Sequence, residues 1–170
     1  MPAPAIVRNT AGLVLRWLGW LSFLPPLLTR LVIGYAFYQT GAGKIANIGN
    51  VTEFFTGLGI PFPALNAAFV ARVEYYGGLL LIVGLLTRVA ASLLGSTMIV
   101  ALLTADKADF LVALAGTGDK GLTDVVPVVY GMFLLWLLVF GPGLASLDAL
   151  LRKWIAPTDG GTKEGDRLAM

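Results

Sequence analysis

The sequence predicts an all-α fold, a transmembrane four-helix bundle with amphipathic interfacial helices at the N-terminus and in the first loop. The first observation is composition: of 170 residues, 57% are hydrophobic and 13% are charged, and the mean hydropathy is +0.82. A water-soluble domain needs a more polar surface. Second, the apolar residues form blocks near the ~20 residues that cross a hydrocarbon core. Third, short connections join these blocks, so one bundle accounts for the chain.

Residues 1–25 are predicted to form an N-terminal interfacial segment. Their apolar stretch is too short to span a bilayer and ends at two prolines. Trp17 and Trp20 lie near Arg16, and tryptophan beside a basic residue is typical of the headgroup level. A cleaved signal peptide is the alternative, and it is disfavoured because no small-x-small cleavage site follows the apolar run.

Residues 26–155 are predicted to form the membrane bundle, with four spans at about 26–46, 64–86, 88–104 and 123–140. Thr87 is the predicted N-cap of the third span, because a threonine side chain can accept a hydrogen bond from a free N–H at a helix start. Gly141 and Pro142 are predicted to end the fourth span, since this pair of residue types stops helices.

The first loop is predicted to hold a short amphipathic helix over residues 51–58. Asn50, followed three residues later by a glutamate, approaches a capping box, which is a typical helix start. The apolar residues after it recur at helical spacing. Gly59, Pro61 and Pro63 cannot continue that helix, because proline lacks the N–H donor and favours an extended turn.

Both ends of the chain are predicted to lie in the cytoplasm. Residues 146–155 are predicted to form an amphipathic helix on the cytoplasmic leaflet, and residues 156–170 a disordered cytoplasmic tail. Cytoplasmic segments carry an excess of Lys and Arg. With four spans, the cytoplasmic side would hold Arg8, Arg16, Arg88, Arg152, Lys153, Lys163 and Arg167, whereas the other side would hold Lys44, Lys107 and Lys120.

The residues that are absent limit the chemistry. The chain has no cysteine and no histidine, so its own side chains offer no catalytic thiol, no thiolate-held metal cluster and no histidine ligand for haem or metal. A redox role would need a bound organic molecule or a partner protein. The net charge of +2 suits a membrane surface rather than nucleic acid. Whether the chain is an enzyme stays open.

Several motifs together resemble the DoxX family of small bacterial membrane proteins, over about residues 27 to 152. They are Arg30, Gly34, Gly41 and Lys44, then Phe55-Thr-Gly-Leu-Gly-Ile-Pro-Phe-Pro63, Glu74 with Gly77 and Gly78, Gly84-Leu-Leu-Thr-Arg88, and Gly141-Pro-Gly-Leu-Ala-Ser-Leu-Asp148. The resemblance implies a four-helix bundle in the bacterial inner (plasma) membrane. For some relatives it implies a link to thiosulfate:quinone oxidoreductase or to membrane complexes that handle oxidative stress; distant relatives resemble cargo receptors or assembly chaperones.

Glu74 is the first candidate for a functional role. It lies about ten residues into the second span, near the bilayer centre, where an unpaired carboxylate is costly. Gly77 and Gly78 share its helical face, which therefore points into the bundle. We expect an ion pair with Arg30, with Lys44 as the alternative partner. Two interpretations stay open: a buried pair that fixes helix register, or the polar floor of a ligand cavity.

The ligand considered is a quinone, the one cofactor that these residues suggest. A quinone head group needs hydrogen-bond donors, a proton acceptor and apolar walls. The candidate ligand-binding residues are Glu74, Arg30, Tyr75, Tyr76, Tyr38 and Lys44. We expect the cavity between spans 1, 2 and 4, under a cover made by residues 51–58 and the turn 60–63, with a lining of Phe54, Phe55 and Phe62.

Three function classes follow from the sequence. The first is an accessory or quinone-linked subunit of a membrane oxidoreductase system, with a soluble or membrane redox partner. The second is a non-catalytic scaffold or assembly factor for another membrane protein. The third is a binder or carrier of a lipophilic small molecule. In each class the lipid bilayer is the surrounding partner, and association with a second copy of the chain stays open.

Overall fold

The computed structural model describes residues 19–155, which consist of helices and their connections without a strand. The elements in order are η1 (Leu21–Phe23), α2 (Leu24–Ala46), α3 (Ile48–Gly57), α4 (Pro63–Val83), α5 (Thr87–Leu103), α6 (Lys107–Ala115), η2 (Leu122–Asp124), α7 (Val126–Phe140) and α8 (Leu147–Ile155). The all-α prediction is confirmed. Most of the predicted N-terminal interfacial segment and the whole predicted tail lie outside the described residues.

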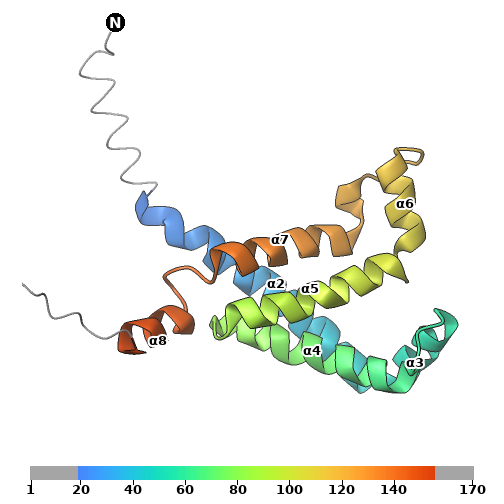
Figure 1. Cartoon of the computed structure of the whole chain (residues 1–170), viewed down its shortest axis with the longest axis horizontal. Helices are drawn as coiled ribbons and strands as arrows, with labels where there is room; N and C mark the ends of the chain where they lie inside the picture. Colours follow the sequence, from blue (N-terminus) through green and yellow to red (C-terminus); the bar gives the residue numbers. More distant parts are fainter. Residues whose placement is uncertain (1–18, 156–170) are drawn as a thin grey trace, which may run out of the picture.

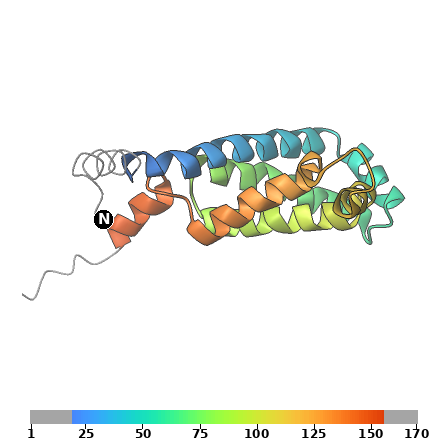
Figure 2. The same ribbon diagram turned by 90° about the horizontal axis from the view of Figure 1, so that it is seen from above.

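Four helices, α2, α4, α5 and α7, form the body of the molecule and run side by side (Figure 2). The short helices sit at opposite ends: α3 and α6 at one end, and α8 at the other, next to the α4–α5 turn (Figure 1). We refer to these as the α3–α6 end and the α8 end. A short turn joins α4 to α5, whereas α3 lies between α2 and α4, and α6 and η2 lie between α5 and α7. These connections bring residues far apart in sequence together at each end.

The chain has helices that can cross a membrane. The segments Leu21–Ala46 and Pro63–Val83 are long and apolar enough on their own, and α5 with α6 would make a third span although the pair is bent by 79°. The apolar helix α7 has 15 residues, about 22 Å at 1.5 Å per residue, and so is short for a ~30 Å core. The count of four spans therefore stays a prediction.

Large apolar side chains cover much of the outer surface of the four long helices. Examples are Val32, Phe69, Ile99 and Leu135, which are 53–65% exposed. A monomeric water-soluble protein rarely leaves so continuous an apolar surface uncovered. Inside, the bundle closes on a core from all four long helices that includes Ile33, Phe37, Leu81, Leu94, Leu134 and Leu137. The surface therefore fits contact with lipid chains around a packed interior.

Glycines form a close seam between α2 and α4. A Cβ atom at Gly78 would lie 2.5 Å from the backbone nitrogen of Tyr38, and one at Gly34 would lie 2.9 Å from the carbonyl oxygen of Gly78. At Gly41 it would overlap the backbone of Tyr75. The small face expected on the second span is thus confirmed, and it draws two helix backbones together as small residues do in membrane bundles.

The first loop differs from its prediction at its start. The helix α3 begins at Ile48 and its N-cap residue Asn47 makes no side-chain capping bond, so the capping box expected at Asn50 is wrong. The other boundary is confirmed, since α3 ends at Gly57 and α4 begins at Pro63. Between them Gly59 and Phe62 adopt positive φ angles of 72° and 48°, which turn the chain sharply into α4.

Candidate functional site

A cavity of about 830 Å³ opens at the α3–α6 end, bounded by α3, α4 and α5. Its size is within the range of small-molecule sites, about 300–1,000 Å³. Most of its wall is apolar, and the apolar residues come from all three helices and the turn after α3: Val51, Phe54, Phe55, Leu58, Ile60, Pro61, Phe69, Val70, Met98, Val100 and Ala101. Such a wall suits a lipophilic ligand.

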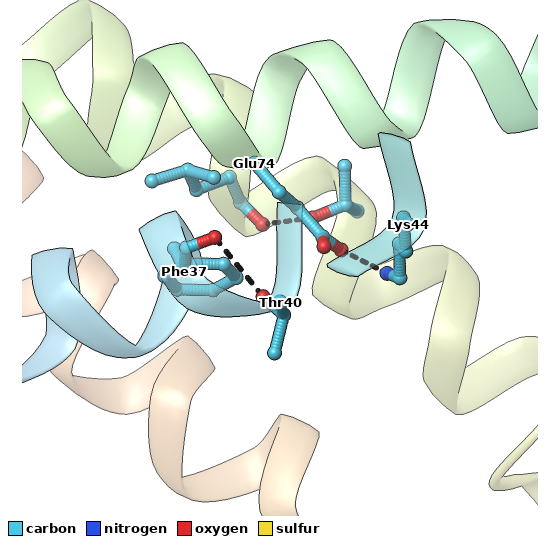
Figure 3. Close-up of polar contacts among 6 residues, drawn as sticks. Phe37, Thr40, Lys44 and Glu74 are labelled. Atoms are coloured by element: carbon cyan, nitrogen blue, oxygen red, sulfur yellow. Dashed lines mark hydrogen bonds and ion pairs between the residues drawn. The ribbon is translucent and has the colours of Figure 1, made fainter. Parts of the chain in front are cut away.

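An ion pair lies at the deep side of this cavity. Lys44, in the last turn of α2, donates a hydrogen bond from Nζ to Oε1 of Glu74 at 2.5 Å. Figure 3 shows the two side chains pointing toward each other from α2 and α4. The Glu74 side chain is 3% exposed and that of Lys44 is 32% exposed, and both residues line the cavity. The pair therefore joins the bundle interior to the cavity.

The expected pairing of Glu74 with Arg30 is wrong, and the glycine seam gives the reason. Gly34 packs against Gly78, and Gly41 packs against Tyr75. In an antiparallel pair this register places Lys44 opposite Glu74. Arg30 is fourteen residues earlier in α2, which is about 21 Å along the helix axis. It therefore lies at the other end of the bundle.

One oxygen of Glu74 has no partner. Oε2 is buried and accepts no hydrogen bond from any side chain or backbone group of residues 19–155. A buried carboxylate oxygen left without a donor is costly, and such exceptions call for an explanation such as a ligand, a water or a proton. Because Glu74 lines the cavity, a ligand there can meet this oxygen.

The tyrosines expected at the site lie elsewhere. Tyr38 and Tyr75 pack ring against ring at 5.1 Å between centroids, and Tyr75 meets Tyr76 edge-on at the same centroid distance. Tyr76 is 60% exposed on the outside of α4, and none of the three lines the cavity. The structure thus brings Glu74 and Lys44 to the cavity and places the tyrosines outside it.

The cavity itself also differs from the expectation. Span 3, as α5, supplies the wall that span 4 was expected to supply. Phe54 and Phe55 line it as expected, but Phe62 is 77% exposed and takes no part. Gly77 and Gly78 leave no space for a ligand, because Leu94 and the backbone of Tyr38 fill it.

Sequence reasoning missed several polar residues of the wall. They are Asn50, Asn66, Ser96, Thr97, Thr104 and Asp106. Asn66 is held in place, since its Nδ2 donates to the carbonyl oxygen of Pro61 at 2.6 Å. A hydroxyl in the middle of an apolar helix is the sequence feature that could have pointed to Thr97. Its hydroxyl already donates a hydrogen bond to the carbonyl oxygen of Leu94.

Known proteins place the chain in a family. The DoxX family profile matches residues 26–107. The inner membrane protein YqjF of Escherichia coli is 31% identical over 134 residues, which cover 75% of this chain and 93% of YqjF. The chain belongs to the DoxX family. The membrane protein Rv3486 of Mycobacterium tuberculosis supports the assignment, with 32% identity over 76% of this chain and 83% of that protein.

A further DoxX relative covers less of the chain. The protein named "Putative oxidoreductase CatD" of Bacillus subtilis is 34% identical over 86 residues. The match spans 50% of this chain and 63% of CatD, which is less than two thirds of that protein. No solved structure matches this DoxX chain.

At the α8 end of this DoxX chain, two of the motifs meet in space. Asp148 accepts hydrogen bonds from the backbone N–H groups of Leu86 at 2.8 Å and Thr87 at 2.9 Å. It thereby caps α5, so the predicted role of Thr87 as the cap is wrong. The N–H of Asp148 in turn donates to the carbonyl oxygen of Gly84 at 2.9 Å. The motif around Gly84 and the motif that ends at Asp148 are thus one structural unit.

Arg30 belongs to this same unit rather than to the cavity. It is 1% exposed and donates from Nη2 to the carbonyl oxygen of Ala145 at 2.5 Å. Gly84, at φ 73°, has no room for a Cβ because Nη1 of Arg30 occupies that position. The buried guanidinium therefore ties α2 to the α4–α5 turn and to the segment before α8.

Proposed function

We propose that this DoxX protein binds a quinone-type lipophile in the cavity at the α3–α6 end, as an accessory subunit of a membrane oxidoreductase system. The observation that carries the proposal is the ion pair of buried Glu74 with the partly exposed Lys44 in the wall of an apolar cavity, with Oε2 of Glu74 left without a donor among residues 19–155. An ionisable residue inside a membrane bundle is by default a candidate for function.

The two charged groups fit both redox forms of a quinone head group. A quinone carbonyl accepts a hydrogen bond, which the ammonium group of Lys44 can donate. A quinol hydroxyl donates one, which Oε2 of Glu74 can accept. The apolar residues of α3, α4 and α5 would hold the ring and the start of its tail. A bound quinone supplies two-electron chemistry, and with no cysteine or histidine in the chain the electrons would come from a redox partner.

Two relatives support the setting of the proposal. CatD is named as a putative oxidoreductase, and YqjF is named as an inner membrane protein. We accordingly propose an inner-membrane location with both termini in the cytoplasm. A carrier of another lipophilic molecule would use the same cavity, so the chemistry of the bound head group distinguishes a carrier from a quinone-linked subunit. A scaffold protein would bind no ligand in the cavity.

The test is ligand-dependent stability of the purified protein in detergent. Decylubiquinone, a short-tailed menaquinone analogue and a tail-matched alcohol without a quinone ring are each titrated while the unfolding temperature is recorded. A ligand that binds only the folded state stabilises it by mass action, and at saturation we expect a rise of about 5 °C with the quinones. The alcohol should give less than half of that rise.

Variants locate the effect. Glu74→Gln and Lys44→Met should reduce the quinone increment, and Ala101→Phe should abolish it by filling the cavity. Tyr76→Phe and Ser92→Phe are the matched controls, because both residues are exposed and outside the cavity wall. A quinone increment that survives Ala101→Phe unchanged, or that falls equally with the controls, would overturn the proposal.

A further inference from the structure

A second hollow, of about 500 Å³, lies at the α8 end, away from the proposed quinone cavity. It is bounded by the start of α5, the chain after α7 and the face of α8. Two arginines line it, Arg88 from α5 and Arg152 from α8, together with Asp148. Both arginines are exposed.

The arginines of this hollow keep unused hydrogen-bond donors. Within residues 19–155, Arg88 makes one hydrogen bond, from Nη2 to the carbonyl oxygen of Val139 at 3.0 Å, although a guanidinium carries five N–H donors. The bond fixes the side chain over the end of α7. Neither Arg88 nor Arg152 has an acidic partner among the described residues, whose salt bridges join Lys44 to Glu74 and Lys120 to Asp109.

The carboxylate of Asp148 does not neutralise the hollow. Each of its two oxygens accepts a backbone N–H at the start of α5, and the positive end of that helix favours a negative charge there. Two arginines against this one engaged carboxylate leave a net positive pocket, and paired arginines are the usual receptors of phosphate oxygens.

The surroundings of the hollow are apolar and interfacial. Phe140 and Leu144 line it and are 73% and 75% exposed. Helix α8 carries Arg152 and Lys153 in its last turn, and its Trp154 is 90% exposed. Basic residues beside exposed tryptophan and leucine are typical of a helix that lies in the headgroup region. A phosphate held between the arginines would thus come with acyl chains alongside Phe140 and Leu144.

We infer that this hollow binds the phosphodiester head group of an anionic phospholipid through Arg88 and Arg152. A zwitterionic head group brings an ammonium ion that the arginines repel, so the site discriminates by net charge. Free inorganic phosphate offers the same oxygens but lacks the acyl chains for the apolar rim. The site is independent of the quinone cavity, since it shares no residue with it.

The experiment titrates the purified full-length protein in a neutral detergent with dioctanoyl phosphatidylglycerol, dioctanoyl phosphatidylcholine or inorganic phosphate. The unfolding temperature and native mass spectra are recorded. Phosphatidylglycerol should raise the unfolding temperature and appear as a bound adduct, whereas the other two should do neither. Equal effects of the two lipids would overturn the assignment to an anionic head group, and an equal effect of phosphate alone would overturn the assignment to a lipid.

Two variants at neighbouring residues distinguish a specific lipid site from general electrostatic attraction between the basic surface and anionic lipid. Arg152→Gln should weaken the apparent affinity for phosphatidylglycerol by about 10-fold, the effect of losing one good charge-assisted contact. Lys153→Gln, adjacent on α8 but outside the hollow, should weaken it less than twofold. Arg88→Gln should reduce the rise in unfolding temperature caused by phosphatidylglycerol as much as Arg152→Gln does. This rise is measured against each variant's own unfolding temperature without lipid, because Arg88 also donates a hydrogen bond to Val139. Equal losses for Arg152→Gln and Lys153→Gln would mean surface attraction only, and would overturn the site. Glu74→Gln should leave the lipid increment unchanged.

Discussion

The two ends of the bundle each bury one charged residue almost completely, but the groups around the two residues differ. Glu74 is 2% exposed and Arg30 is 1% exposed. Arg30 donates one hydrogen bond, to the carbonyl oxygen of Ala145, and its Nη1 packs against the turn at Gly84, while Nε and Nη1 find no acceptor within residues 19–155. Glu74 pairs with Lys44, whose side chain is 32% exposed, and both residues line the cavity. The two buried charges therefore differ in what surrounds them: Arg30 lies between chain segments, whereas Glu74 lies in the wall of the cavity where we propose that a quinone binds.

This contrast predicts its largest effect at Asp148. Asp148→Ala removes both N-terminal hydrogen bonds of α5, so we expect a loss of about 2–4 kcal/mol in the free energy of unfolding. Reversible unfolding in mixed detergent measures it. Asp148→Asn, which keeps an acceptor but not the charge, should fall between wild type and Asp148→Ala. A loss at Asp148→Ala no greater than that at Glu74→Gln would break the comparison.

The next effect concerns the partner of Glu74. Glu74→Gln should cost only about 1–2 kcal/mol, because Lys44 is partly exposed and can turn its ammonium group to water once its partner is gone. In a double-mutant cycle, Lys44→Gln and Glu74→Gln should couple by about 1 kcal/mol. Arg30→Gln and Glu74→Gln should be additive within about 0.5 kcal/mol, since the two residues lie at opposite ends. Coupling in the second cycle and none in the first would contradict the register of the α2–α4 seam.

Orientation in the membrane decides which end of the molecule faces the cytoplasm. The excess of basic residues predicts that the α8 end does. Alkaline phosphatase fused after the last residue should therefore be inactive, and the same enzyme inserted near Gly118, beside α6, should be active. Green fluorescent protein at the same two positions is the control and should show the opposite pattern. An active C-terminal phosphatase would contradict this orientation. It would place the lipid site on the outer side of the membrane and the cavity on the cytoplasmic side.

The smallest effect lies at the surface of the α3–α6 end. The hydrogen bond and charge of Asp109 raise the pKa of Lys120 above its ordinary value of 10.5. A raised lysine pKa in the folded state means that the pair stabilises the protein below about pH 10.5 and that this contribution is lost as the pH rises through the higher folded pKa. Lys120→Gln should thus lower the free energy of unfolding slightly at pH 8 and leave it unchanged at pH 12, which unfolding at the two pH values measures. Lys107→Gln, which lacks an ion pair among residues 19–155, should show no such pH dependence.

The sequence by itself determined the helical membrane fold, the sharp turn after α3, the small face of α4 and the burial of Glu74 on that face. These follow from properties that act locally along the chain, such as apolar block length, proline's missing donor and the cost of a carboxylate at depth. The family resemblance also came from the sequence, as did both candidate partners of Glu74. What the sequence left open was which of them it meets.

The tertiary structure alone decided that partner, because the answer depends on the register of two helices. Gly34, Gly41 and Gly78 bring the backbones of α2 and α4 together in one alignment, and sliding one helix past the other by a few residues would exchange Lys44 for another neighbour. The cap of α5 by Asp148 has the same origin, since its donors lie more than sixty residues earlier in the chain. Contacts of this kind are set by packing across the whole bundle, which no local pattern of residues records.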